Sequence, residues 1–281
     1  MERKKANKNI IINEIKSFIA EENAKSGLWQ EPIVGFAGVG SEYIRRLREV
    51  VHPEHQMPEE VLANAKVVIA YFVPFDEKVA DSNIGAPGST APSGTTSGDL
   101  ASPQWAESYE VTNAMFGRLN KRIIEKIKSL GFDAATAPEA EVFYRDEVMS
   151  HWSFRHLAYA AGLGTFGLNN MLITEKGCSG RYNTIVTDMD VEPDEPLTEE
   201  ACLYKRDGSC GICMIKCPAG AITENGFDRH KCYEQCLKNA EIYTGFGSSY
   251  TGGADNSEAA DIGSEVCGKC IAGMPCTHKR P

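Results

Sequence analysis

Apolar residues recur every three or four positions along two long stretches of the chain, which is the spacing of one buried helix face. The first stretch spans residues 8–25 and precedes Gly27, and the second spans residues 104–130 and precedes Gly131. Because glycine is common just beyond a helix end, the pattern predicts two long helices, and a third, shorter helix is predicted over residues 151–161. The apolar positions of the two long faces are Ile11, Ile12, Ile15, Phe18, Ile19, Trp105, Tyr109, Phe116, Leu119, Ile123, Ile127 and Leu130.

Short apolar runs predict β-strands between these helices. The run at residues 67–73 contains no charged residue and ends at Pro74, which is typical of a strand buried on both faces. Shorter candidates lie at residues 171–174 and 183–187. Helices that alternate with short strands predict an α/β (α+β) domain over residues 1–195.

Composition narrows the function classes. The chain has 281 residues, 42% of them hydrophobic, and a formal net charge of −10 at pH 7, so it can form one or two domains with a real core. The acidic charge argues against a polyanion as the main partner, because phosphates are bound by clustered Lys and Arg. No apolar run approaches the roughly 20 residues of a membrane helix. Neither a membrane partner nor a secretory signal is predicted, and a cytoplasmic protein is expected.

The segment from residue 82 to 102 is crowded with Gly, Pro, Ser and Thr and has no periodicity. We expect a long loop there, which in a compact domain is a lid, a binding loop or simply a mobile segment.

Cysteine spacing predicts metal chemistry. Every cysteine except Cys178 lies beyond residue 200, and the segment 210–218 has the order Cys-x2-Cys-x3-Cys-Pro. In bacterial ferredoxins, closely spaced cysteines bind one 4Fe-4S cluster and the cysteine before proline binds the other. Cys202 can supply the missing first position if residues 203–209 loop out.

Two such clusters need eight thiolates. Cys267, Cys270 and Cys276 supply three more, so the eighth ligand is Cys232 or Cys236. A zinc ribbon also contains paired Cys-x2-Cys, but it needs neither the proline nor ten cysteines. A disulfide framework would require an oxidising compartment. We therefore predict a ferredoxin-like double 4Fe-4S module over residues 196–281, beyond a boundary that Pro193 and Pro196 mark.

A glycine-rich motif spans residues 162–167 and fits the dinucleotide-binding pattern G-x-G-x-x-G. That pattern binds a pyrophosphate only when a strand precedes it and a helix follows it. Here the predicted order is the reverse, so we expect a tight turn that lets a ligand approach the backbone closely.

Three segments together resemble the epoxyqueuosine reductase family, which is related to reductive dehalogenases: residues 161–174, 185–188 and 217–222. The likeness extends over about 145–281. It implies a cobalamin-binding domain joined to two 4Fe-4S clusters, with electrons passing singly to a corrinoid cobalt at the domain junction. The reduced cobalt would then reduce an organic substrate.

The resemblance also implies a ligand set. Family members carry a basic stretch that ends in cysteine, present here at residues 229–232, which makes Cys232 the eighth ligand and leaves Cys178 and Cys236 over. The implied sets are Cys202, Cys210, Cys213 and Cys276 for one cluster, and Cys217, Cys232, Cys267 and Cys270 for the other.

Two departures from the family bear on the substrate. The family's aspartate general acid falls at Val148 here, so the acid is missing or replaced by a neighbour; Asp146, His151 and His156 are the candidates. The tRNA-acting members carry a C-terminal helical extension that is not found after Cys276, which together with the acidic charge argues against tRNA. The implied corrinoid-binding residues are Arg155, Gly162, Gly164, Gly167, Asn169 and Arg181.

Three functions are compatible with this sequence. The first is a cobalamin-dependent reductase of a small-molecule substrate, and the second is an electron-transfer protein that reduces a partner or its corrinoid. In both, a low-potential donor such as ferredoxin or flavodoxin would supply the electrons. The third is a redox sensor that uses the spare thiols.

Overall fold

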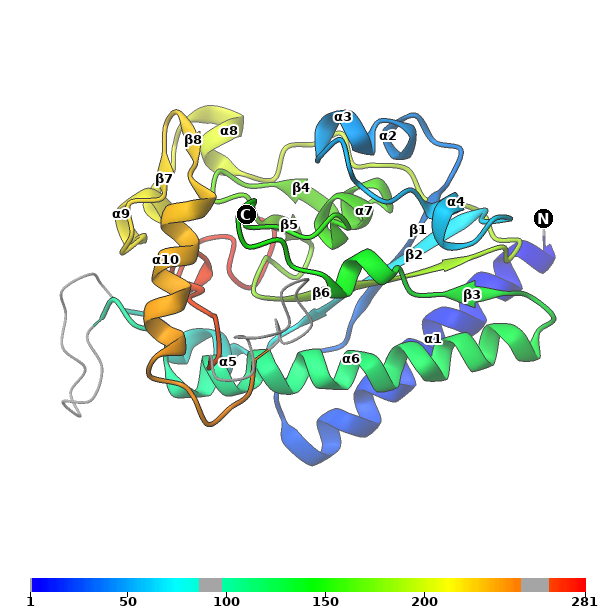
Figure 1. The fold of residues 1–281 in the computed structure, drawn as a ribbon, viewed down its shortest axis with the longest axis horizontal. Coiled ribbons are helices and arrows are strands. Elements are labelled where there is room, and N and C mark those ends of the chain that lie inside the picture. The colour runs from blue at the N-terminus through cyan, green and yellow to red at the C-terminus, as the bar shows by residue number, and fades with distance from the viewer. Residues whose placement is uncertain (1, 86–97, 249–262) are drawn as a thin grey trace.

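A central antiparallel sheet organises the computed structural model, which describes residues 2–85, 98–248 and 263–281 (Figure 1). Its four strands lie in the order β1-β2-β6-β3, and every neighbouring pair is antiparallel. The mixed α/β class is therefore confirmed, in its α+β form. The strands of the main sheet and of two small hairpins are β1 (Ile33–Gly38), β2 (Val67–Pro74), β3 (Ala134–Ala135), β4 (Gly164–Phe166), β5 (Leu172–Thr174), β6 (Gly180–Thr187), β7 (Ile222–Thr223) and β8 (Gly226–Phe227).

Helices cover both faces of this sheet (Figure 1). Among the described residues, no helix is long and apolar enough to cross a membrane. The predicted strand at 67–73 is confirmed as β2, which is buried along its whole length. The helices are α1 (Glu2–Ser26), α2 (Glu42–Arg45), α3 (Leu47–Val50), α4 (Pro58–Val61), α5 (Glu77–Ser82), α6 (Pro103–Ser129), η1 (Pro138–Glu141), α7 (Phe154–Ala160), α8 (Leu203–Asp207), α9 (Ile212–Lys216), α10 (Arg229–Ala240) and η3 (Lys269–Ile271).

Alternate residues of β2 enter different cores. Ile69 and Tyr71 belong to a buried cluster that includes the apolar faces of α1 and α6. Val68 and Ala70 belong to a second cluster that includes Leu157 of α7. Because side chains alternate across a strand, a strand covered on both faces needs apolar residues at every position, and this explains the uninterrupted run.

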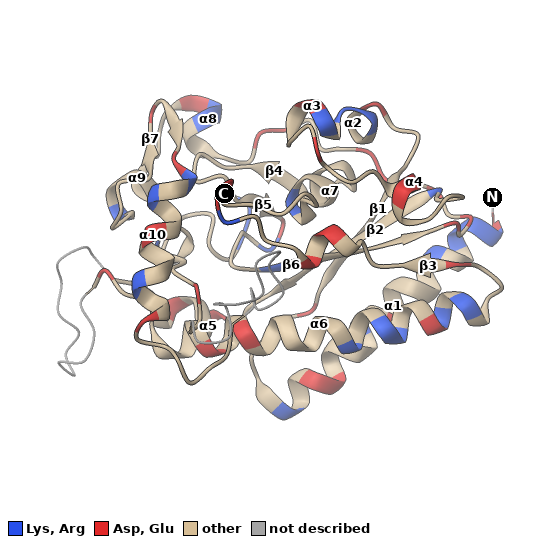
Figure 2. Ribbon diagram, viewed as in Figure 1, with Lys and Arg blue, Asp and Glu red and all other residues tan. Residues whose placement is uncertain are grey.

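The two long predicted helices are confirmed, and they pack on each other along one face of the sheet (Figure 1). Ion pairs join their exposed sides: Arg122 on α6 lies 2.6 Å from Glu14 and 2.7 Å from Glu21 on α1. Figure 2 shows acidic and basic residues interspersed along both helices. Exposed ion pairs of this kind contribute little to stability individually. The contact between α1 and α6 is therefore stabilised mainly by their buried apolar faces.

Packing of α6 can be tested at Leu119, which is completely buried. Replacing Leu119 by alanine should lower the free energy of unfolding by about 2–5 kcal/mol, because a cavity forms where the side chain packed. Denaturant unfolding measures the change. The same substitution at exposed Lys121 on this helix is the control and should change stability by less than about 0.5 kcal/mol.

The third predicted helix is shorter than expected, because residues 151–153 are engaged elsewhere. The carbonyl of His151 accepts a hydrogen bond from the Gln56 amide at 2.8 Å, and the indole of buried Trp152 donates to Thr184 Oγ1 at 2.9 Å. These contacts keep His151 and Trp152 out of the helix, so α7 begins only at Phe154.

The described part of the C-terminal segment (residues 196–248 and 263–281) packs against the sheet and its helices. Its Val266, Ile271 and Tyr243 lie in the same buried cluster as Trp105 of α6. A Cβ at Gly268 would lie 2.3 Å from Trp105 Cζ2, which explains the glycine between two cysteines. The division into two domains stays a prediction.

The expected boundary near Pro193 is tied to the sheet as well. The Asp194 amide donates to the Phe36 carbonyl at 2.7 Å, and the Asp194 carboxylate accepts from the Phe36 amide at 3.0 Å. The loop expected over residues 82–102 lies largely outside the described residues.

Candidate functional site

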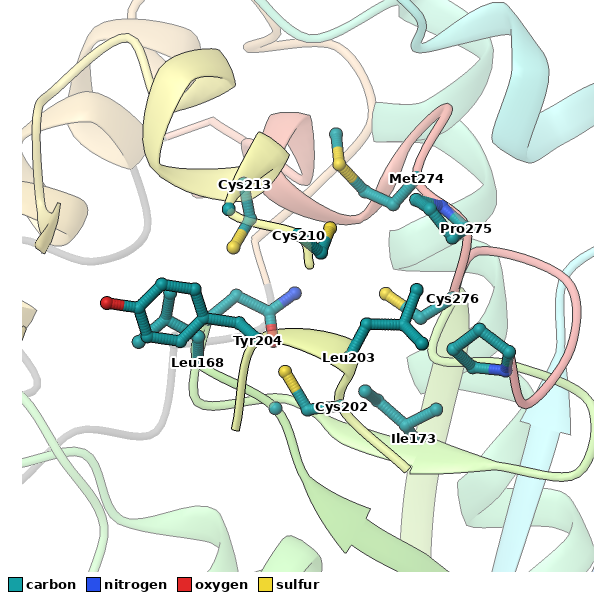
Figure 3. Close-up of a pocket in the computed structure, with 14 residues that line it drawn as sticks. Leu168, Ile173, Cys202, Leu203, Tyr204, Cys210, Cys213, Met274, Pro275 and Cys276 are labelled. Carbon is teal, nitrogen blue, oxygen red and sulfur yellow. The ribbon is translucent and has the colours of Figure 1, made fainter. Parts of the chain in front are cut away.

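Four of the predicted ligands, Cys202, Cys210, Cys213 and Cys276, line one pocket (Figure 3). Cys202 directly precedes α8, Cys210 and Cys213 lie at the start of α9, and Cys276 lies in a turn after η3. Figure 3 shows the sulfurs of Cys202, Cys213 and Cys276 directed toward the space between them. The other lining residues are Gly167, Leu168, Asn169, Ile173, Leu203, Tyr204, Gly211, Met274, Pro275 and Pro281.

A short helix brings Cys202 and Cys210 to the same pocket. Residues 203–209, predicted to loop out, form α8 and its end. Gly208 closes the helix with φ +77°, a left-handed conformation that suits glycine. The chain then returns, and Cys210 precedes α9.

The chemistry of this pocket suits a metal-thiolate centre. Its lining is mostly apolar, and burial raises the pKa of Cys213 to about 11, with Cys276, Cys202 and Cys210 adding repulsion between thiolates. Several thiolates in such surroundings are stable only when a cation neutralises them, and soft ligands of this kind select Fe-S clusters or zinc. The four residues therefore fit the predicted group.

The second predicted set lies on and around α9, α10 and η3. Cys217 follows α9, Cys232 lies on α10, and Cys267 and Cys270 flank the start of η3. Burial raises the pKa of Cys267 to about 12, and the next contributions that raise it come from Cys232 and Cys217. The assignment of these four cysteines to one cluster stays a prediction.

Cys236 lies in the same place, one helical turn beyond Cys232 on α10. The pKa of Cys236 is raised mainly by a hydrogen bond with Cys232 and secondly by burial. Negative charge on Cys267 and Cys270 raises this pKa further. Both candidates for the eighth ligand thus face the second set. The choice of Cys232 stays a prediction.

Serine substitution separates these two cysteines. Cys232→Ser should lower the iron content of anaerobically prepared protein from about eight to about four per chain, because a cubane that loses one thiolate is unstable. Cys236→Ser should retain both clusters. Iron and sulfide analysis of the two variants checks this, and the reverse outcome would exchange the two assignments.

The candidate proton donors differ in environment. Asp146 is exposed on a hairpin that the Tyr144–Met149 bridge closes. His156 Nδ1 lies 2.7 Å from Ser153 Oγ, and burial lowers its pKa to about 3, so its imidazole is neutral at pH 7. His151 is buried, with Nε2 2.6 Å from the Glu147 carboxylate.

Sequence reasoning missed Glu147 and His52, which complete a cluster with His151. The hydrogen bond from His151 lowers the pKa of Glu147, and the i, i+4 spacing of the two was a visible signal. One ligand atom of each of the three residues lies within 4.8 Å of the others. However, the His52 and His151 rings stack at 13° with centroids 4.6 Å apart. A metal lies in the plane of each imidazole that binds it, so nearly parallel rings do not suit one ion.

The hairpin that holds Glu147 carries backbone strain. Val148 has φ +53°, which is rare for a β-branched residue. Arg229 at the start of α10 donates to the Glu147 carbonyl at 3.5 Å. The strained hairpin therefore contacts the helix that carries Cys232.

The glycines predicted to admit a ligand are approached by the protein's own atoms. A Cβ at Gly162 would lie 2.5 Å from the Glu195 carbonyl oxygen, and one at Gly164 would lie 2.3 Å from that of Ile173. At Gly167 the Asn169 carboxamide oxygen would be at 2.7 Å. The turn contains strand β4, and its glycines are required by internal packing.

The other predicted corrinoid-binding residues also make contacts within the protein. Arg155 donates a hydrogen bond to the Asn170 carbonyl. The Cζ atom of Arg181 lies over the Tyr109 ring, 3.8 Å from the ring centroid. Asn169 donates to the Cys270 carbonyl at 3.0 Å. These residues do not present a free cradle for a corrinoid, so that assignment stays a prediction based on resemblance.

Comparison with known proteins finds relatives of one kind, although no family model matches the chain. The chain is 27% identical over 178 residues to an epoxyqueuosine reductase of Bacillus anthracis, a match that covers 62% of this chain and 41% of the relative. It is 31% identical over 128 residues to a tetrachloroethene reductive dehalogenase of Desulfitobacterium hafniense, covering 43% of this chain and 20% of the relative.

Solved structures show the same fold. A selenomethionine-labelled epoxyqueuosine reductase superposes with a TM-score of 0.51 at 17% identity, over 95% of this chain and 66% of that one. An epoxyqueuosine reductase with an epoxyqueuosine-modified tRNA stem loop gives a TM-score of 0.50 at 18% identity, with the same coverage of both chains. The chain spans about two fifths of the length of the two curated epoxyqueuosine reductases it matches first.

Proposed function

We infer that this chain, an epoxyqueuosine reductase-like protein related to reductive dehalogenases, is an oxidoreductase that uses two 4Fe-4S clusters to reduce a small-molecule substrate. The four-cysteine pocket carries this proposal. Its donor set and apolar lining suit a cubane cluster, and a second group of thiols lies around α10 and η3.

Contacts between the two halves of the chain support an electron path toward the sheet. Gly167, Leu168 and Asn169 line the four-cysteine pocket, and the Asn169 carboxamide also contacts the carbonyl of Cys270. The turn after β4 thus touches both thiol groups. Electrons would enter from a low-potential carrier such as ferredoxin or flavodoxin and leave at this turn. We place the reaction in the cytoplasm, where thiols stay reduced.

Cobalamin is the proposed acceptor of these electrons, on the strength of the family relation alone. When bound, it would supply a low-valent cobalt that reduces organic substrates. The residues that the resemblance implies for it, Arg155 and Asn169 among them, make contacts within the protein, so their role in holding it stays a prediction. Titration of cobalamin into anaerobic, cluster-loaded protein should give a saturable spectral change at tens of micromolar corrinoid. If both clusters are present and no change occurs, the chain is an electron-transfer protein instead.

Gly164 is unsuitable as a probe of this binding, because any side chain there would strike β5. Arg155→Lys is a milder test. A weakened corrinoid response with unchanged iron content would support a direct role for the guanidinium.

For proton delivery we propose His151, held by Glu147. The imidazole of His151 is buried, and the Glu147 carboxylate at 2.6 Å from Nε2 fixes its orientation, so this pair is suited to pass a proton to a bound substrate. A small molecule is the proposed substrate because acidic and basic residues are interspersed along the chain (Figure 2) and the net charge is −10. A tRNA stem loop should therefore bind weakly, and gel-shift measurement at physiological salt tests this.

A further inference from the structure

We propose that Cys178 donates an S–H···S hydrogen bond to the Cys276 thiolate and thereby raises the reduction potential of the cluster in the four-cysteine pocket. The inference rests on the proposed function, because it requires that Cys276 bind a cluster. It assigns a role to a thiol that is not needed as a ligand.

The geometry places one thiol directly behind the other. Cys178 is 0% exposed, and its Sγ lies 3.9 Å from Cys276 Sγ, a distance at which sulfur accepts a hydrogen bond from a thiol. Cys276 lines the four-cysteine pocket and Cys178 does not. Cys178 therefore lies outside the ring of ligands and against one member of it.

The backbone fixes this arrangement. The Cys178 amide donates to the Cys276 carbonyl at 3.0 Å, and the Ser179 amide donates to the Thr277 carbonyl at 3.2 Å. At Gly177, φ is +77° and a Cβ would lie 2.2 Å from the Thr277 carbonyl oxygen. The turn before β6 is thus built to pack against the segment that carries Cys276, and this packing sets the distance between the two sulfurs.

Hydrogen bonds to cluster sulfurs tune the reduction potential. Reduction adds one negative charge to the cluster and its thiolates, so a donor to a ligand sulfur stabilises the reduced form more than the oxidised form. The buried site excludes water, which could otherwise replace a missing donor. Loss of the Cys178 thiol should therefore make the cluster harder to reduce.

The test compares Cys178→Ala with Cys178→Ser in anaerobically prepared full-length protein, since the two variants differ by one hydroxyl donor. Both should retain about eight iron per chain. Potentiometric titration followed by electron paramagnetic resonance should show one cluster shifted to lower potential in Cys178→Ala. The expected shift is a tenfold change in its ratio of reduced to oxidised form at a fixed potential, which is about 59 mV for one electron.

In Cys178→Ser that cluster should stay within about threefold of the wild-type ratio, because the hydroxyl donates to sulfur in its place. The second cluster is the internal reference and should not move in either variant. If the reduction potential does not shift in Cys178→Ala, or shifts equally in both variants, Cys178 only fills space and the proposal is wrong. A loss of about four iron in Cys178→Ala would make it a ligand and overturn the proposal. Absence of clusters from the wild type would instead refute the proposed function.

Discussion

Cys270→Ser should remove about four iron and four sulfide per chain and leave the other cluster in place. It should also loosen the C-terminal segment, because metal binding and folding are coupled in small cluster-binding regions. Cys270 packs against the buried cluster that contains Trp105, and burial raises its pKa. A serine there cannot replace the soft thiolate, so this substitution is the most damaging of those considered.

Iron and sulfide analysis, together with limited proteolysis, measures this effect. New cleavage sites should appear within residues 196–281 and not in α1 or α6. Cys178→Ser is the matched control, because it also exchanges sulfur for oxygen in a buried cysteine. Full iron content in Cys270→Ser would remove Cys270 from the ligand set.

Arg145→Met should lower the free energy of unfolding by about 3–5 kcal/mol, because it leaves a buried carboxylate without its counter-charge. The Glu265 side chain is fully buried and lies 3.4 Å from Arg145. It accepts a hydrogen bond from Tyr233 at 3.0 Å, and its second oxygen has no hydrogen-bond partner among the described residues. Arg145 therefore joins the hairpin of Glu147 to α10 and to the segment before Cys267.

The pH dependence of this deficit follows from the same burial. Burial raises the pKa of Glu265 above its usual 4.5, and removal of Arg145 should raise it further. The cost of ionising Glu265 is absent below the unfolded-state pKa and grows as pH rises toward the raised folded-state pKa. Denaturant unfolding at pH 6 and pH 8 should show the larger deficit at pH 8. Arg145→Met/Glu265→Gln is the control variant, and it should recover most of the loss. If the double variant loses as much unfolding free energy as Arg145→Met, the loss does not come from the unpaired Glu265 carboxylate.

The long elements were predictable because their patterns are local. The apolar faces of α1 and α6 can be read from the helical spacing of their apolar residues. The strand β2 can be read from its unbroken run of apolar residues. β1 was missed because it contains glycines at Gly35 and Gly38 and has no clear alternation. A Cβ at Gly35 would lie 2.3 Å from the Ala161 carbonyl oxygen, so tertiary packing decides that strand.

The candidate site was predictable to a similar degree. Cysteine spacing together with the family resemblance grouped Cys202, Cys210, Cys213 and Cys276, and the fold places them around one pocket. Spacing could not distinguish Cys232 from Cys236, because both point from the same face of α10. The predicted order around the glycine-rich turn, with a helix before it and a strand after it, is confirmed by α7 and β4, but the close contacts of its glycines are with the protein's own atoms.

Partners distant in the sequence escaped prediction. His52 meets Glu147 and His151 across about a hundred residues, and the stacking of Tyr144 on His151 at 3.9 Å depends on the hairpin. Cys178 was left without a role for the same reason, since only the fold brings it to Cys276.

Iron and sulfide analysis of the anaerobically prepared wild-type chain tests the central claim most directly. Two cubane clusters require about eight iron and eight sulfide per chain, with no stoichiometric zinc. Iron near four per chain, or one zinc ion per four cysteines, would contradict the account.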